Sequence, residues 1–216
     1  MNELFESGGN SHYHDWRNKR FNFIQKHYDN KFGMGFFNQK KMLEYGCGRG
    51  HFGRMFEEVG CEVTHLDGRP EHISWIKSNY PKSDVILMDC EKYCMKEYYD
   101  IILHSGLLYH IQPKYVKTHL EKVLESNFKY LILEACVLDS DDENAFLETP
   151  QRGYDQAISE KGSLFPNIAI EKILKDNNIS FQRFNNPELD STIHVYSWTP
   201  KNTGLYGGRS LWLCEK

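Results

Sequence analysis

The stretch "LEYGCGRGHFG", Leu43 to Gly53, decides the fold. It follows an apolar run and precedes apolar residues at helical spacing, so it predicts a tight turn between a strand and a helix. Gly46, Gly48 and Gly50 alternate along this turn. Glycines permit positive φ there, and they let a ligand approach the backbone where a side chain would block it. In an open α/β sheet, the first strand-turn-helix is the usual ligand cradle.

Short apolar runs alternate with helical patterns through the rest of the chain. Buried strands that alternate with helices predict an α/β fold with a doubly wound, mostly parallel, Rossmann-like sheet and helices on both faces. Gly204, Gly207 and Gly208 predict a turn between the last two strands, so the last strand is expected to be antiparallel. The expected strands are 41–46, 61–67, 84–89, 99–106, 128–137, 179–184, 192–198 and 209–216, and the expected helices are 52–59, 73–80, 116–124 and 168–175.

The segment before the first strand predicts one more helix. Trp16, Phe23, Ile24 and His27 recur at helical spacing within residues 11–30, which is consistent with a helix packed over the first strand. The basic residues around them are interpreted as a solvated face of that helix and not as a nucleic-acid interface. These basic residues are Arg17, Lys19, Arg20 and Lys26.

Residues 139–166 also fall outside the alternation of strands and helices. The segment is too long and too polar for a routine connection. Loops of this size in compact domains tend to be lids or binding loops, and a loop with that role is expected here.

Composition favours one globular domain. A chain of 216 residues with 40% hydrophobic content can bury one sizeable core, and no linker divides it. The formal net charge of -4 gives no basic excess for a phosphate backbone, so a nucleic-acid partner is disfavoured. The sequence shows no signal peptide and no membrane span, so a soluble cytoplasmic protein is expected. Its six cysteines lie mostly in apolar runs and predict reduced core thiols, and no metal site is expected.

Two carboxylates narrow the identity of the ligand at the glycine turn. The turn alone is compatible with a dinucleotide, a flavin, S-adenosylmethionine or no ligand. Glu44 precedes the first glycine, and its charge disfavours a pyrophosphate but favours an ammonium and a sulfonium. Asp67 ends the second predicted strand, where a carboxylate accepts both hydroxyls of a ribose. The alternative is that Glu44 solvates a strand end and that Asp67 caps the helix near Pro70.

The motifs "LEYGCGRG", "HLDGRPEHI", "MDCEKY" and "YDIILHSGLLYHI" resemble, in order and spacing, those of the class I S-adenosylmethionine-dependent methyltransferases. The resemblance covers residues 40–135 and implies a seven-stranded sheet with a reversed final hairpin. It also implies S-adenosylmethionine as the cofactor, with S-adenosylhomocysteine as its product. The site residues that it implies are Glu44, Gly46 and Gly48 for the methionine portion, Asp67 for the ribose, Asp89 and the Cys90 backbone for the adenine, and His104 and Ser105 beside the methyl donor. Gly68 is a further expected cofactor-binding residue.

Two positions depart from the pattern of this family. Tyr45 stands where a small aliphatic residue is usual. Gly68 and Arg69 follow the ribose carboxylate, which leaves Pro70 or Ile73 to stack on the adenine, and both choices stay open. The expected organisation is a single domain, 1–216, with an N-terminal helical cap (1–38), a cofactor-binding half (40–135) and a substrate-side half (139–216).

The second half of the chain carries the information on the methyl acceptor. The motifs "GYDQAISEKGSLFPNIAIEKIL", "STIHVYSW" and "GGRSLWLCEK" resemble methyltransferases of glycan and polysaccharide biosynthesis, which implies a sugar hydroxyl as acceptor and O-methylation as the reaction. Aromatic rings offer flat faces to a pyranose, and polar side chains offer directional hydrogen bonds. Ordinary core aromatics are the alternative interpretation. The candidate acceptor residues are Tyr154, Trp198, Tyr206 and Trp212 among the aromatics, and Asp155, Gln156, His194 and Arg209 among the polar residues.

Methyl transfer to a hydroxyl requires in-line approach and a proton acceptor. Histidine suits this task without a shift of its pKa, and His110 follows the fourth strand at the ligand crevice, so it is the first candidate base. His194 and Asp155 are the second candidates. A Mg²⁺ ion held by Asp155 and Glu134 would be another way to activate the hydroxyl, although metal-independent chemistry is preferred.

Other functions stay open from the sequence. Within enzymes, the "GLLYH" segment also resembles methyltransferases of tRNA bases, and a small metabolite is a further possible acceptor. In a different class, the chain could be a non-catalytic cofactor-binding subunit of a partner. The acceptor sugar, the hydroxyl and the oligomeric state are not determined by the sequence.

Overall fold

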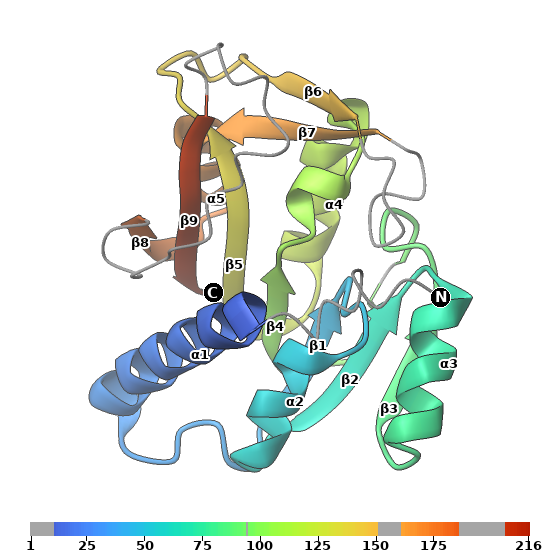
Figure 1. The fold of residues 1–216 in the computed structure, drawn as a ribbon. Coiled ribbons are helices and arrows are strands. Elements are labelled where there is room, and N and C mark those ends of the chain that lie inside the picture. Colours follow the sequence, from blue (N-terminus) through green and yellow to red (C-terminus); the bar gives the residue numbers. More distant parts are fainter. Residues whose placement is uncertain (1–10, 94, 151–160, 186–205) are drawn as a thin grey trace.

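The computed structural model describes residues 11–93, 95–150, 161–185 and 206–216, and all structural statements below concern these residues. Figure 1 shows a central twisted sheet with helices on both sides. The helices are α1 (Ser11–Phe32), α2 (His51–Glu58), α3 (Pro70–Asn79), the 3-10 helix η2 (Leu108–His110), α4 (Pro113–Glu125) and α5 (Asn167–Asp176). The strands are β1 (Lys41–Tyr45), β2 (Glu62–Asp67), β3 (Asp84–Leu87), β4 (Tyr99–Ser105), β5 (Phe128–Leu138), β6 (Leu147–Pro150), β7 (Lys161–Pro166), β8 (Ser180–Asn185) and β9 (Tyr206–Glu215).

The strand order confirms the doubly wound fold. Strands β3, β2, β1, β4 and β5 are neighbours in that order and all pair in parallel. The last strand, β9, pairs antiparallel with β5, and β8 pairs antiparallel with β9. These seven strands form the expected sheet with an antiparallel last strand, and β7 and β6 extend it from the end of β5 to nine strands. The order reverses between β1 and β4, so a crevice is expected at the carboxyl ends of these two strands.

Two layers of helices bury the two faces of the sheet. On one face, α1 and α2 pack with apolar side chains of β1, β2, β4, β5 and β9. On the other face, α4 and α5 pack with the side chains that point the opposite way from β1, β4, β5 and β9. Figure 1 shows α1 and α2 in front of the sheet and α4 behind it. The alternating side-chain directions of a strand make this possible, because each buried strand supplies apolar residues to both layers.

The N-terminal helix is confirmed, but one residue of its basic face was interpreted wrongly. Arg20 is only 1% exposed, and its Nη2 lies 3.6 Å from Oε1 of Glu134. The helical period explains this burial, because Arg20, Ile24 and Tyr28 are spaced at i, i+4 and i+8 on one stripe that faces the sheet.

Part of the long polar segment 139–166 forms a β-hairpin and not an irregular loop. Strands β6 and β7 pair antiparallel, and β7 joins the end of β5 at Val137 and Leu138. The Ser163 hydroxyl donates to the carbonyl of Ile111, which ties the hairpin to the end of η2. The hairpin therefore lies beside the segment that carries His110, while residues 151–160 fall outside the described residues.

The glycines near the C-terminus also have a different role from the one expected. Gly207 and Gly208 lie within β9 and not in a turn before it. Gly208 has a φ of 91°, and the pairing of β5 with β9 shifts register between Val137 and Leu138. The two glycines thus belong to an irregularity in the strand, where a positive φ requires the residue without a side chain. Gly204 and the predicted strand 192–198 lie outside the described residues.

The five described cysteines are buried and free of disulfides, as expected. Burial raises the pKa of Cys61 and the pKa of Cys90 to about 12, so both are protonated thiols at neutral pH. None of the described helices combines the length and apolar character that a membrane crossing requires.

Candidate functional site

The three glycines of the turn after β1 all have positive φ, but they face different surroundings. A Cβ on Gly46 would lie 2.7 Å from Cδ1 of Leu107, and one on Gly50 would lie 3.2 Å from the ring of His65. A Cβ on Gly48 would meet no described atom within 4 Å. Glycine is therefore required at positions 46 and 50, because φ is positive there and because a side chain would collide with neighbouring protein atoms. Gly48 is the position where the turn is open to a ligand.

Asp67 lies beside that open position. It ends β2 and is buried, and its Oδ2 accepts a hydrogen bond from the amide of Gly48 at 2.9 Å. Its Oδ1 accepts from the amide of Arg69 at 2.8 Å and lies 3.1 Å from Nδ1 of His72. Arg69 is the residue before α3, so this contact restrains the segment that leads into the helix and is not a cap of its first turn. A carboxylate has about four acceptor sites and these contacts use three of them, so one site remains for a ribose hydroxyl.

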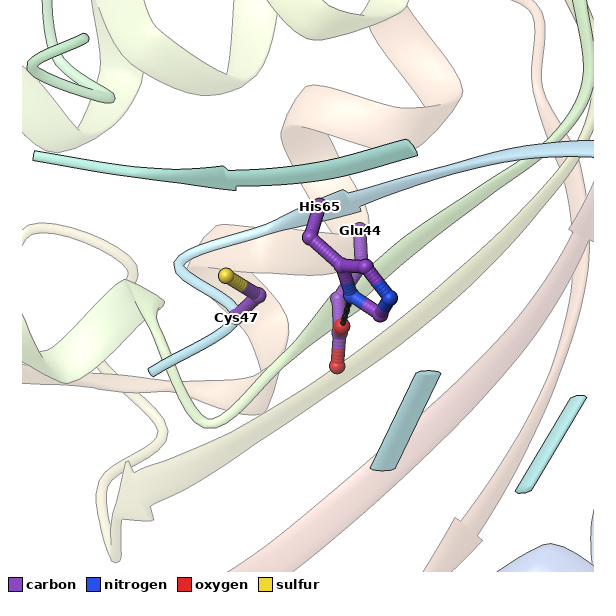
Figure 2. Close-up of side chains that lie close together, drawn as sticks. All are labelled: Glu44, Cys47 and His65. Atoms are coloured by element: carbon purple, nitrogen blue, oxygen red, sulfur yellow. Dashed lines mark hydrogen bonds and ion pairs between the residues drawn. The ribbon is translucent and has the colours of Figure 1, made fainter. Parts of the chain in front are cut away.

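Glu44 is buried beneath the turn and contacts protein groups with both oxygens. Oε1 accepts from the amide of Gly53 in α2 at 3.0 Å, and Oε2 lies 2.7 Å from Nδ1 of His65 on β2 (Figure 2). The other ring nitrogen of His65 lies 3.3 Å from Glu57. Burial lowers the pKa of His65, but the hydrogen bonds and charges of Glu44 and Glu57 outweigh it and raise this pKa to about 9. The pair is therefore a carboxylate with an imidazolium at neutral pH.

The side chains of Glu44, Cys47 and His65 place possible metal-ligating atoms within 4.8 Å of one another. Two atoms bound tetrahedrally to one zinc ion at 2.0–2.2 Å would lie about 3.3 Å apart. The observed 2.7 Å between Glu44 and His65 is the distance of a charge-assisted hydrogen bond instead. Figure 2 also shows the Cys47 thiol pointing away from the other two side chains. A shared proton, and not a metal, accounts for this geometry.

The loop after β3 holds the residues expected at the adenine. Asp89 accepts from the amide of Glu91 at 3.0 Å and forms an ion pair with Lys92 at 3.0 Å. Cys90 is buried in the same apolar cluster as Tyr45, the residue before Gly46. The structure thus brings this loop against the glycine turn. Ile73 is buried and Pro70 is exposed at the start of α3, and both stay candidates for stacking.

His104 does not face the crevice, which contradicts the expectation that its side chain lies beside the methyl donor. It is fully buried, and its Nε2 lies 2.8 Å from Nε2 of His119 on α4. Burial lowers the pKa of His104 to about 3 and that of His119 to about 4, so both rings are neutral. Successive side chains of a strand point to opposite faces of the sheet, so His104 points toward α4 and Ser105 points to the opposite face.

Ser105 ends β4 and joins a buried charge cluster. Its hydroxyl donates to Oε2 of Glu134 at 2.9 Å, and Oε1 of Glu134 accepts from Nη1 of Arg209 at 2.7 Å. Nη2 of Arg209 donates to the Tyr109 hydroxyl at 3.1 Å. Burial raises the pKa of Glu134, but the charges of Arg209 and Arg20 outweigh it and keep this pKa below its usual value. Glu134 is therefore an ionised anchor, and its bonded oxygens disfavour the suggested role as a Mg²⁺ ligand.

Arg209 and Trp212 are the predicted acceptor residues whose side chains the structure describes, and Arg209 is buried in this cluster. Trp212, considered for sugar stacking, is also buried in the apolar core, which contradicts that role. His110 lies at the end of η2, partly exposed, with its ring 4.3 Å from that of Tyr109. The remaining predicted acceptor and base residues lie outside the described side chains: Tyr154, Asp155, Gln156, His194, Trp198 and Tyr206.

Sequence reasoning missed three histidines that support the site. His65 and His72 contact the two carboxylates Glu44 and Asp67, and His119 contacts His104. His119 was detectable in principle, because it lies on the same helical face as Val116, Leu120 and Val123. No pattern in the sequence pairs His65 with Glu44, since this contact depends on the register of β1 with β2.

A family model described as "Methyltransferase domain" matches residues 16–181. Among curated proteins, none matches the chain. The family match covers most of α1, the glycine turn, the loop after β3, the pair of His104 and His119, and strands β6 and β7.

Solved structures share the fold at low sequence identity. The N-terminal domain of EvdMO1 with S-adenosylhomocysteine bound has a TM-score of 0.67 at 13% identity, covering 96% of this chain and 85% of that chain. The same domain was also solved in the presence of S-adenosylhomocysteine and D-fucose.

Two further structures come from enzymes named for heterocyclic substrates. The 1,6-didemethyltoxoflavin-N1-methyltransferase of Burkholderia thailandensis has a TM-score of 0.58 at 18% identity, covering 95% of this chain and 84% of that chain. The magnesium protoporphyrin IX methyltransferase of Synechocystis PCC 6803 with S-adenosylmethionine bound has a TM-score of 0.62 at 15% identity, covering 96% and 85% of the two chains. These likenesses show a common fold.

Proposed function

The chain belongs to the methyltransferase-domain family, and from this premise we propose that it methylates a hydroxyl of a sugar or glycan with S-adenosylmethionine as the donor. It is an S-adenosylmethionine-dependent methyltransferase. The single observation that carries the cofactor site is the hydrogen bond between Asp67 and the amide of Gly48. This bond places a carboxylate beside the one glycine of the turn that opens toward a ligand.

The residues of this turn fit the cofactor that the family implies. Asp67 would accept a hydrogen bond from the ribose, Gly48 would leave room for the methionine portion, and Gly46 would contact that portion with its backbone. Gly68, Asp89 and the Cys90 backbone would contact the adenosyl group. Glu44 lies beneath the glycine turn, where its carboxylate contacts Gly53 and His65. It would supply negative charge near the cationic cofactor without contacting it directly.

The acceptor would approach from the ends of β4 and η2, where Ser105 and His110 lie. The bound cofactor supplies an electrophilic methyl group on a sulfonium. As the acceptor oxygen takes the methyl group, its proton must leave, and an imidazole nitrogen of His110 would accept it. Asp155 and His194 remain the other candidate bases. Tyr154, Gln156, Trp198 and Arg209 would contribute to the acceptor site, with Arg209 acting through its contacts with Glu134 and Tyr109.

The proposal of a sugar acceptor rests on the motifs of the C-terminal half, and the study of the EvdMO1 domain with D-fucose supports it by analogy. The deciding experiment supplies methyl-labelled S-adenosylmethionine with a panel of nucleotide sugars and short oligosaccharides. Label in a methyl ether of a sugar supports the proposal. The Asp67→Ala variant is the control, because it should bind the cofactor more weakly and transfer less label when the cofactor is below saturation. Absence of transfer to every sugar in the panel would reject the sugar acceptor.

A small-metabolite acceptor is the second candidate, since two similar structures belong to methyltransferases named for toxoflavin and porphyrin substrates. Adding nitrogen heterocycles and tRNA to the same panel distinguishes these acceptors from sugars. Cofactor binding without transfer to any class would instead favour a non-catalytic subunit.

The base is tested once an acceptor is found. His110→Ala should lower kcat by roughly a hundredfold with unchanged affinity for S-adenosylhomocysteine, and the pH profile should lose its limb near the pKa of histidine. Asp155→Asn and His194→Ala are tested in parallel. Full activity in all three variants would exclude each of these residues as the base, and loss of activity with a chelator would point to a metal.

A further inference from the structure

Tyr109 lies between the buried charge cluster and the candidate base. It is a buried residue of η2, and His110 directly follows it. The ring centroids of these two residues are 4.3 Å apart, and the planes of the rings meet at 47°. Ring pairs at this separation are in contact, and tilted arrangements are favourable. The imidazole of His110 therefore lies against the ring of Tyr109.

The ring of Tyr109 is itself held at its hydroxyl end. Nη2 of Arg209 donates to the hydroxyl at 3.1 Å, while Nη1 of the same guanidinium donates to Glu134 at 2.7 Å. The other carboxylate oxygen of Glu134 accepts from Ser105, the last residue of β4. A guanidinium presents its donors in a rigid fork, so the two bonds fix the tyrosine hydroxyl relative to the end of β4.

Apolar packing and one side-chain contact hold the rest of η2. Tyr109 packs in a cluster with apolar residues of β5 and β7, among them Leu138 and Leu164. The hydroxyl of Ser163 on β7 donates to the carbonyl of Ile111, the residue that follows η2. The internal hydrogen bonds of a 3-10 helix have poorer geometry than those of an α-helix, so these tertiary contacts stabilise its position.

We propose that Tyr109 is a positioning residue that holds the imidazole of His110 in the orientation in which it takes the acceptor proton. This inference rests on the proposed function, because it assigns the base to His110. A base must lie within hydrogen-bond reach of the proton that it removes, and contacts that lock its rotamer maintain this reach. Burial raises the pKa of Tyr109, so the tyrosine hydroxyl keeps its own proton and is not the base.

Proton NMR of the His110 ring tests the contact without any ligand. The ring current of Tyr109 should displace the two carbon-bound ring protons of His110 from the positions typical of an exposed histidine. Tyr109→Leu removes the ring and should return these signals to those positions. The loss of the same signals in His110→Ala assigns them. Tyr98→Phe is the matched control, because it deletes a tyrosine hydroxyl that contacts Asp100 near the start of β4, and it should leave the signals unchanged.

The role in catalysis is tested by kinetics once an acceptor is found. Tyr109→Leu should lower kcat nearly as far as His110→Ala, roughly a hundredfold, with unchanged affinity for S-adenosylhomocysteine. Its pH profile should keep the limb near the pKa of histidine, because the base is still present. Tyr109→Phe keeps the ring but loses the bond to Arg209, and should lower kcat by about three- to tenfold, the effect of one ordinary hydrogen bond. Tyr98→Phe should leave kcat unchanged.

Two kinds of failure are distinguishable. Unchanged His110 signals in a folded Tyr109→Leu variant would overturn the inference, and so would an unchanged kcat in that variant when His110→Ala is impaired. A fully active His110→Ala variant would instead reject the proposed base. The contact with Tyr109 would then have no role in catalysis, even with the expected NMR signals.

Discussion

Nδ1 of His65 lies 2.7 Å from Oε2 of Glu44, and both side chains are buried below the glycine turn. The register of β1 with β2 sets Glu44 directly opposite His65. The same carboxylate accepts from the amide of Gly53, so one charged pair joins β1, β2 and the first turns of α2. The protonation state of His65 is thereby coupled to the shape of the turn.

We expect the stability of the protein to be highest near pH 6.5. The pKa of His65 is raised to about 9 in the folded state, so its contribution is complete below pH 6.5 and is lost as the pH rises from 6.5 to 9. The pKa values of His104 and His119 are lowered to about 3 and about 4, so their contribution is present above pH 6.5 and is lost below it.

Thermal unfolding of the apo protein from pH 4 to 9 measures this profile. His65→Gln should reduce the loss of thermal stability between pH 6.5 and 9 and should leave the loss at acid pH unchanged. His119→Asn should reduce the loss of thermal stability below pH 6.5. If His65→Gln lost as much stability between pH 6.5 and 9 as the wild-type protein, His65 would not be the group that causes this loss.

Gly53→Ala should destabilise the protein although it lies within a helix. Alanine normally stabilises a helix interior by about 0.5–1 kcal/mol relative to glycine. Here a Cβ would collide with Oε2 of Glu44 and would lie 2.8 Å from Cε1 of His65. We expect a net loss of about 1–3 kcal/mol in the free energy of unfolding, measured in urea. Glu58→Ala, at an exposed position of the same helix, should change it by less than about 0.5 kcal/mol.

Asp67→Ala should weaken binding of S-adenosylhomocysteine by about 1–3 kcal/mol, the loss expected for charge-assisted hydrogen bonds. The variant should also be less stable, because Asp67 accepts from the amides of Gly48 and Arg69. Asp67→Asn separates the two effects, since its amide oxygen can still accept from one of these amides. Calorimetric titration gives the affinity and thermal unfolding gives the stability. An unchanged dissociation constant in both variants would place the ribose elsewhere.

Glu134→Ala should cost about 3–5 kcal/mol of stability, because it leaves the buried charge of Arg209 without its carboxylate partner. Glu134 is 1% exposed, so water cannot replace the lost contacts. The exposed ion pair of Lys172 with Asp176 is the comparison, and Lys172→Ala should cost about 0.5 kcal/mol or less. Equal effects of the two substitutions on urea unfolding would show that burial does not strengthen the Glu134 cluster.

Most of the fold could be predicted because its signals are local. Apolar runs such as 99–106 and helical spacing such as that of 116–124 report burial directly, and the structure confirms them as β4 and α4. The glycine turn is equally local, since positive φ at Gly46, Gly48 and Gly50 depends on a few neighbouring residues. The hairpin of β6 and β7 was missed because its strands are short and polar.

The site was predicted less completely, because a side chain's role depends on which neighbours face it. The family resemblance implied that His104 lies beside the methyl donor, but the alternation of β4 turns its side chain toward His119. Arg20 was expected in solvent from its charge, but its position on the stripe of Ile24 and Tyr28 brings it to Glu134. In each case the residue type and the element were known, and the direction of the side chain was not.

The sequence by itself determined the alternation of strands and helices, the glycine turn and the carboxylates at Glu44 and Asp67, since these follow from patterns within short segments. The tertiary structure alone decided that Glu44 and Glu57 favour the charged form of His65, that Gly48 and not Gly46 or Gly50 has free space beside it, and that Arg209 contacts Glu134. The physical reason is that these contacts join residues far apart in the chain through strand register and side-chain direction. A shift of one residue in that register would reverse every one of those directions.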